Sequence, residues 1–128
     1  MSLRDLYAEY SDRVQFLMIY IREAHPTDGW DVGSQYRTHD PKTLEERRQV
    51  AADCEIALQY GIHTYVDEMD DAVMTAYAAW PERLYLIDKE GLVAYAGARG
   101  PWGFKPAELK EAIDHIIARP NSTAYHAW

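Results

Sequence analysis

The sequence predicts a single α/β domain built around a mixed sheet. Three observations favour this class: an apolar run at residues 14–21 (VQFLMIYI), helix-like patterns that alternate with strand-like ones, and a hairpin signal at residues 83–97 (RLYLIDKEGLVAYAG). The run at 14–21 is apolar at nearly every position, which is typical of a strand buried on both faces. Strands separated by helices imply parallel pairing, whereas the hairpin adds an antiparallel edge.

Length and charge narrow the function classes. The 128 residues suit one domain, and the 48% of hydrophobic residues supply a core. Thirteen Lys and Arg against twenty-one Asp and Glu leave a net charge of −8, which argues against nucleic acid as a partner. No apolar run approaches the roughly 18 residues of a membrane helix, and the amino terminus lacks a signal peptide. We therefore expect a cytoplasmic protein with no membrane partner.

The first half of the chain predicts two helices around the apolar strand. Leu3, Leu6 and Tyr10 recur at helical spacing, and the strand at 14–21 follows. Residues 22–42 are rich in Gly, Pro, Asp and His, and so long a connection in a small domain tends to be functional. A second helix begins at a capping box formed by Thr43 and Glu46 and stops before Gly61. Its inward face is expected to carry Leu44, Val50, Ala51, Cys54 and Leu58.

The second half predicts a strand, a helix, a hairpin and a final helix. The strand covers 63–66, the helix covers 69–80, and two strands at 83–87 and 92–96 flank an Asp-Lys-Glu-Gly turn. The inward face of the helix at 69–80 is expected to carry Val73, Ala76, Tyr77 and Trp80. The last helix covers 106–117, and its inward face is expected to carry Leu109, Ile113 and Ile116. We expect one domain at 1–118 and a mobile C-terminal tail at 119–128.

Four sequence blocks resemble one known family. FLMIYIREAHPTDGW, TLEERRQVA, VDEMDDAVMTAYAAWPERLYLID and GARGPWGFKPAEL occur in the order and spacing of the iodothyronine deiodinases, and more closely of their bacterial deiodinase-like relatives among the thioredoxin-fold redoxins. The resemblance runs from about Leu6 to Ile117. It implies a thioredoxin-like fold with helices flanking a four-stranded mixed sheet. It also implies a thiol- or selenol-dependent reductase that acts on iodinated aromatics or peroxides with a thiol reductant.

The resemblance also implies that a catalytic element is absent from these residues. In the family, the reactive selenocysteine or cysteine follows a first strand and precedes the helix that matches Leu3 to Tyr10. We therefore expect a domain truncated at its amino terminus, without a nucleophile and inactive as it stands. One hypothesis is that an upstream UGA codon for selenocysteine is read as a stop.

The resemblance assigns catalytic and substrate-binding roles to several residues. His25 matches the family's active-site histidine, whose pKa near neutrality suits proton transfer, and Glu23 would orient its imidazole. Arg83 resembles the arginine that peroxiredoxin-type redoxins hold beside the reactive thiol, where its charge stabilises the thiolate; the alternative is an ion pair with Glu82 or Asp88. Arg99 matches a substrate-binding arginine, whose fork of donors suits a carboxylate or phenolate. We assign Trp30 to the substrate site as well. Each of these side chains could instead be structural or solvated.

Cys54 is the only thiol in the chain. On the inward side of a helix it is expected to be a small buried hydrophobe with a raised pKa. The alternative is a resolving thiol that needs the absent nucleophile as its partner. Pro41 stands where thyroid-hormone deiodinases carry a histidine, with His39 out of register, which argues against that substrate. No histidine spacing supports a metal site, and we expect no cofactor.

The absent strand would lie between the strands at 14–21 and 83–87. An open gap costs too much in unpaired backbone groups, so we expect either direct pairing, in the order 63–66, 14–21, 83–87, 92–96, or insertion from another copy. Either outcome favours a homodimer. Three function classes remain open: a reductase, dehalogenase or peroxidase whose catalytic segment is absent, a non-catalytic small-molecule binding module, and a self-assembling module.

Overall fold

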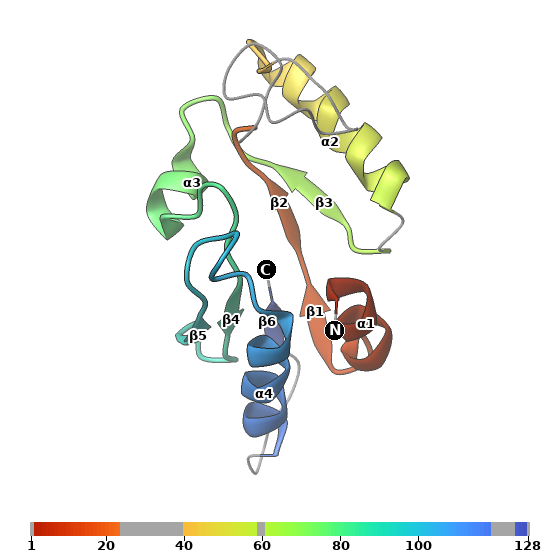
Figure 1. Cartoon of the computed structure of the whole chain (residues 1–128), viewed down its shortest axis with the longest axis vertical. Helices are drawn as coiled ribbons and strands as arrows, with labels where there is room; N and C mark the ends of the chain where they lie inside the picture. The colour runs from red at the N-terminus through yellow and green to blue at the C-terminus, as the bar shows by residue number, and fades with distance from the viewer. Residues whose placement is uncertain (1, 24–39, 59–60, 119–124, 128) are drawn as a thin grey trace.

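The computed structural model describes residues 2–23, 40–58, 61–118 and 125–127, and it confirms a mixed α/β fold (Figure 1). The helices are α1 (Leu3–Tyr10), α2 (Leu44–Leu58), α3 (Ala72–Tyr77) and α4 (Pro106–Ile117), and the strands are β1 (Val14–Phe16), β2 (Met18–Tyr20), β3 (Thr64–Val66), β4 (Tyr85–Ile87), β5 (Val93–Ala96) and β6 (Tyr125–Ala127). Most predicted elements are therefore present.

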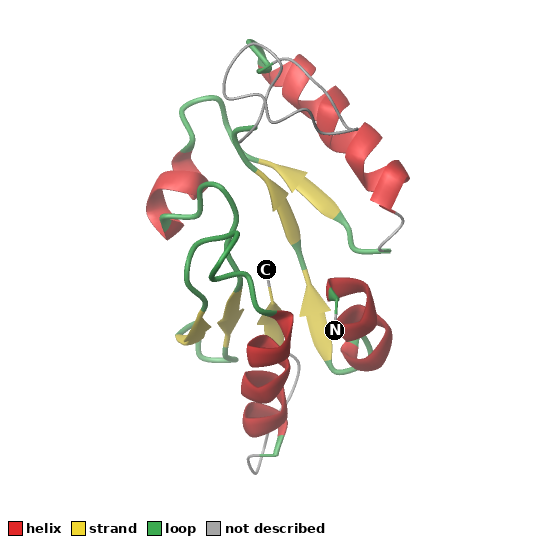
Figure 2. Cartoon of the chain, in the orientation of Figure 1, coloured by secondary structure: helices red, strands yellow, loops and turns green. Residues whose placement is uncertain are grey.

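The strands form two sheets rather than the one that the sequence predicts (Figure 2). The predicted strand at 14–21 is divided at Leu17: β1 belongs to a four-stranded sheet in the order β1-β6-β4-β5, whereas β2 pairs in parallel with β3. β4 and β5 form the predicted antiparallel hairpin. The expected order of the four strands is therefore wrong. β6 lies between β1 and β4, and β3 pairs with β2 in a separate sheet.

β6 occupies the place that we expected to be closed by direct pairing or by another copy. It pairs in parallel with β1, through Phe16 and Ala127 among others, and antiparallel with β4, where Leu86 lies opposite Ala127. Residues 125–127 belong to the segment predicted to be a mobile tail, and 119–124 lie outside the described residues. Filling the gap from the same chain supplies backbone partners to both β1 and β4.

The core lies where α1 and α4 pack together over the four-stranded sheet. It is formed by Leu6 and Tyr10 of α1, Val14 and Phe16 of β1, Ile62, Leu84 and Leu86, and Leu109, Ile113 and Ile116 of α4. The predicted apolar face of the last helix is thus confirmed. The Tyr10 hydroxyl donates to the Asp114 carboxylate, and Lys110 Nζ donates to that hydroxyl at 3.0 Å, so a polar contact also joins the two helices.

A second cluster joins α2, β3 and α3 through a buried cation. Arg47 of α2 is 1% exposed, and its guanidinium donates to the backbone oxygens of Asp67 and Glu68 and, at 3.1 Å, to the Asp71 carboxylate. Arg22, just after β2, pairs with the other carboxylate oxygen of Asp71 at 3.3 Å. Asp71 therefore links α2 to the end of β2.

The helix at 69–80 is shorter than predicted. α3 spans only Ala72–Tyr77, because Ala78 adopts a left-handed conformation at φ 49° that ends the helix. The helix begins where the Asp67 carboxylate accepts hydrogen bonds from the backbone N–H groups of Val73 and Met74. Ala76, predicted to face inward, is exposed, whereas Val73, Tyr77 and Trp80 are half-buried.

Replacing Arg47 with methionine should lower the free energy of unfolding by about 3–5 kcal/mol, because the Asp71 carboxylate would lose its buried partner. The neighbouring Arg48 is exposed, so Arg48→Met is the matched control and should change stability little. Urea unfolding followed by circular dichroism measures both. Equal stability of the two variants would contradict a structural role for the buried guanidinium.

Replacing His126 with proline should destabilise the protein by about 1–3 kcal/mol, because a strand between two neighbours uses every N–H and proline has none. His126→Ala keeps the N–H and serves as the control. If the two substitutions shift the urea midpoint equally, residues 125–127 do not form a central strand.

Candidate functional site

A cavity of about 490 Å³ lies between β2 and the segment that leads into β4. One wall is the continuous stretch 17–23, and the facing wall includes residues 81–85 together with Val73, Tyr77 and Ala79. Leu3, Phe16, Ile62, Phe104 and Leu109 complete a lining that is mostly apolar. The cavity therefore suits an apolar or aromatic group, with a few polar side chains at its margin.

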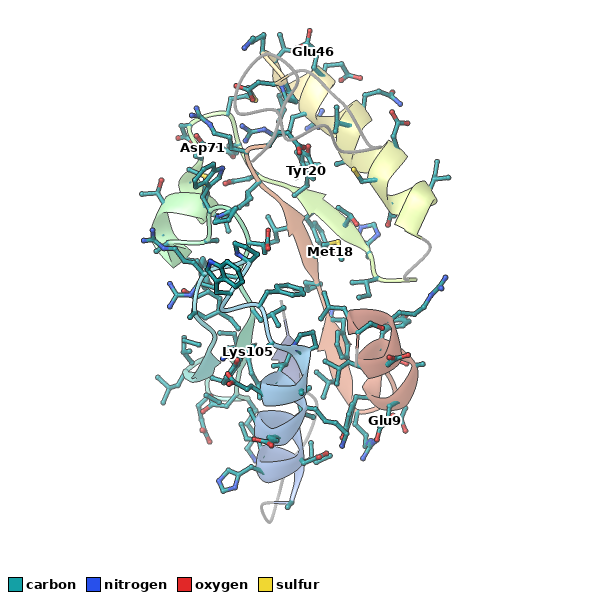
Figure 3. All side chains as sticks on the ribbon, in the orientation of Figure 1. Glu9, Met18, Tyr20, Glu46, Asp71 and Lys105 are labelled. Carbon is teal, nitrogen blue, oxygen red and sulfur yellow. The ribbon has the colours of Figure 1, made fainter. Side chains whose placement is uncertain are left out.

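A tyrosine and a carboxylate are paired at the end of β2. The Tyr20 hydroxyl donates a hydrogen bond to the Glu23 carboxylate, and both residues line the cavity. Burial raises the pKa of Tyr20 well above its usual value, and the hydrogen bond to Glu23 raises it further. The phenol therefore stays protonated. Figure 3 shows Tyr20 at the same end of β2 as Asp71. The pair is a hydrogen-bond donor and acceptor at the cavity wall.

Arg83 brings a positive charge to the opposite wall. Its Nε donates to the backbone oxygen of Gly97 at 2.5 Å, and its guanidinium carbon lies 5.1 Å from the ring centroid of Tyr85. Among the described residues, no carboxylate lies within ion-pair distance of Arg83, so the expected alternative of an ion pair with Glu82 or Asp88 does not occur. A half-buried cation without a carboxylate can stabilise an anion in the cavity.

Cys54 lies on α2, on the side of β2 that carries Tyr20. Burial raises the pKa of the Cys54 thiol, and the carboxylates of Glu23 and Asp53 raise it further. The side chain is only partly buried, but its thiol is kept protonated at neutral pH. The prediction of a raised pKa is confirmed. A role as a resolving thiol is untested.

The structure brings together only part of the predicted site. Glu23 and Arg83 line the same cavity. Arg99 is exposed, outside the cavity lining. His25 and Trp30 lie outside the described residues, so their roles stay predictions.

Sequence reasoning missed Tyr20, which sits in the apolar run like a core residue. The period-two spacing places it on one side of β2 with Met18, but nothing in the sequence predicts that its hydroxyl meets Glu23. Tyr77, whose backbone oxygen accepts a hydrogen bond from the Tyr85 hydroxyl, was predicted only as an inward residue.

Two features are absent from the described part of the chain, a metal-binding cluster and a membrane-spanning helix. No three His, Cys, Asp or Glu side chains there are grouped closely enough to hold a metal ion. None of the described helices has the length and apolar character needed to cross a membrane.

Comparison with known proteins gives one consistent result. A family described as iodothyronine deiodinase matches residues 1–117. The chain is 42% identical over 130 residues to a thyroxine 5-deiodinase of Gallus gallus, covering 94% of this chain and 46% of that protein. A thyroxine 5-deiodinase of Sparus aurata is 39% identical over 114 residues, covering 88% of this chain and 42% of that protein. The chain thus spans less than half the length of these relatives. Both are vertebrate proteins, which bears against the bacterial affiliation expected from the sequence.

Cys54 should react more slowly with iodoacetamide in the native protein than in urea, because only the thiolate reacts and its formation is disfavoured in the fold. The difference should narrow as the pH rises through the raised pKa of the native thiol. Replacing Glu23 with glutamine removes one cause of that shift and should speed alkylation of the native protein. Glu111→Gln, at an exposed position of α4, is the control. A Glu23→Gln rate no faster than the control would show that Glu23 does not act on the thiol.

Proposed function

Because the chain belongs to the iodothyronine deiodinase family, we propose that it forms the substrate-binding and proton-handling part of a thiol- or selenol-dependent reductase. The observation that carries the proposal is the apolar cavity with Arg83 on one wall and the Tyr20–Glu23 pair on the other. The proposed substrates are iodinated aromatic compounds, with peroxides as the alternative. We also propose that the complete domain has a thioredoxin-like arrangement, for which the parallel β2–β3 pair and the antiparallel β4–β5 hairpin are support.

The proposed chemistry requires a reductant. In a reductive deiodination, an aryl carbon–iodine bond breaks, a carbon–hydrogen bond forms, and iodide leaves. Two thiols, or a selenol and a thiol, supply the two electrons and become a disulfide or selenenyl sulfide. One of their protons goes to the carbon and the other leaves with the iodide. The protein must therefore bind the aromatic ring, stabilise an anionic group and move a proton.

The described residues can meet these three needs. The apolar lining accommodates an iodinated ring, because iodine and aromatic carbon are poorly hydrated. The Arg83 guanidinium would face a phenolate or carboxylate. Tyr20, held protonated, donates a hydrogen bond that orients the Glu23 carboxylate, which can accept a proton, and the role that the resemblance assigns to His25 would supply the proton donor.

No residue of this chain is proposed as the nucleophile. Cys54 is the only thiol, and its raised pKa makes it a poor one at neutral pH. This observation also favours the second candidate function, a module that binds a small molecule without turning it over. We further propose that the protein acts as a homodimer. Light scattering measures its oligomeric state.

Thyroxine is the probe for the proposed cavity. Arg83→Met should weaken thyroxine binding at least about tenfold, because a charge-assisted hydrogen bond is lost. Arg99→Met should bind like the unmodified chain, because Arg99 is exposed and does not line the cavity. Quenching of tryptophan fluorescence measures the affinity, and thermal unfolding checks that both variants are folded. Equal loss in both variants would contradict the assignment of this cavity, whereas no binding of thyroxine would agree with the argument from Pro41 against thyroid hormone as the substrate.

The same chain with thyroxine and dithiothreitol should release no iodide above a buffer control. An iodide-selective electrode measures the release. Turnover that survives Cys54→Ser would show that another residue of this chain supplies a nucleophile.

A further inference from the structure

The Arg83 guanidinium is bonded to backbone oxygens through two of its nitrogens. Nε donates to Gly97 O at 2.5 Å, and Nη1 donates to Tyr77 O and Ala78 O, each at 3.4 Å. Tyr77 and Ala78 lie at the end of α3, where carbonyl groups have no partner inside the helix. The side chain of Arg83 therefore satisfies the end of α3 and also holds the chain that follows β5.

Tyr85 fixes this arrangement from the face of the guanidinium. Arg83 Cζ lies 5.1 Å from the centroid of the Tyr85 ring, which is a cation–π contact. The Tyr85 hydroxyl donates to the backbone oxygen of Tyr77, one of the two oxygens that Nη1 contacts. The rings of Tyr77 and Tyr85 also meet edge to face, with their centroids 5.0 Å apart. Because Tyr85 is only 9% exposed, its ring sets the plane of the guanidinium.

Nη2 is the guanidinium nitrogen that stays available to a ligand. Among the described residues, no acceptor is bonded to Nη2, and Arg83 lines the cavity. An arginine usually binds a carboxylate through two parallel N–H groups, one on Nη2 and the other on Nε or Nη1. Here both possible partners of Nη2 are already used by backbone oxygens, so only a single-point contact is offered.

From this geometry we infer that Tyr85 is a positioning residue: it holds Arg83 so that the cavity receives an aromatic anion through one oxygen atom, as in a phenolate, rather than through the two oxygens of a carboxylate. The inference rests on the proposed binding of iodinated aromatic compounds and specifies which anionic group Arg83 meets. A phenolate has one oxygen, which Nη2 can meet without turning the guanidinium. A carboxylate would leave its second oxygen desolvated and unbonded unless Arg83 released Gly97 or the end of α3.

Substitutions at Tyr85 separate positioning from packing. Tyr85→Phe keeps the ring and its cation–π contact, so it should keep the preference for a phenolate. Tyr85→Leu removes the ring, which frees the guanidinium to turn two N–H groups toward a ligand. Phenolate binding should then weaken, whereas carboxylate binding should not. A residue that only packs would weaken the binding of both ligands to the same extent.

The probes are 2,4,6-triiodophenol and 2,4,6-triiodobenzoate, which share the ring and its iodine atoms. Isothermal titration at pH 8, where both are anions, should show at least about fivefold tighter binding of the phenolate to the unmodified chain. Tyr85→Leu should abolish this preference, and so should Arg83→Met. Tyr95→Leu is the matched control, because Tyr95 does not line this cavity, and it should leave the preference unchanged. Thermal unfolding checks that each variant is folded.

A second measurement needs no substitution at Tyr85. In protein with ¹⁵N-labelled arginine, triiodophenol should shift the Nη2 resonance of Arg83 and leave its Nε–H resonance in place, because that group stays bonded to Gly97. The spectrum of Arg83→Met assigns both resonances. A shift of the Nε–H resonance would show that two N–H groups bind the ligand and would overturn the inference.

The binding results also distinguish this inference from the proposed function. Equal affinity for the two probes, with both lost in Arg83→Met, would overturn the inference and leave the proposed binding of iodinated aromatic compounds standing. Tighter binding of the benzoate, loss of the preference in Tyr85→Phe, or equal weakening of both probes in Tyr85→Leu would overturn it as well. Absence of binding by either probe would contradict the inference and the proposed function together.

Discussion

The buried guanidinium of Arg47 is the contact on which the arrangement around the cavity depends. It holds the backbone at the end of β3 and the carboxylate of Asp71 at the start of α3, and Asp71 in turn pairs with Arg22 at the end of β2. Removing a charge from water is costly, so the geometry is kept only while the hydrogen bonds are made. The cluster thereby fixes the wall that ends in Glu23 relative to the wall that includes Tyr77.

The two walls of the cavity are held apart by contacts below and above it. Below the cavity, β6 spans the distance between β1 and β4 and sets it at two strand spacings, about 9–10 Å. Above the cavity, Arg47 and Asp71 hold the elements that frame it. The space between is mostly apolar, so it can accept an aromatic ring. The proposed reductase chemistry uses the end where Tyr20 and Arg83 lie.

The ionisable groups of the site are of two kinds: acids that stay protonated and an arginine that keeps its charge. Cys54 and Tyr20 are both held in their protonated forms, by burial and by the nearby Glu23 carboxylate. Arg83 keeps its charge and makes hydrogen bonds to backbone oxygens rather than to a carboxylate. The chain therefore offers hydrogen-bond donors and a cation, which suit the binding of a small molecule, and a thiol poorly suited to nucleophilic attack.

Local patterns in the sequence were enough to predict the class, most elements and part of the site. Helical spacing predicted α1 and the buried face of α4, the turn residues predicted the β4–β5 hairpin, and the block FLMIYIREAHPTDGW indicated the family and Glu23. Pairing of distant segments could not be predicted, because a three-residue strand such as β6 is too short to show a periodic pattern. Its place in the sheet depends on the unpaired edges of β1 and β4, which come together only in the folded chain. The burial of Arg47 was likewise decided by tertiary structure, since a charged residue on an apolar helix face enters the core only when partners from other segments meet it there.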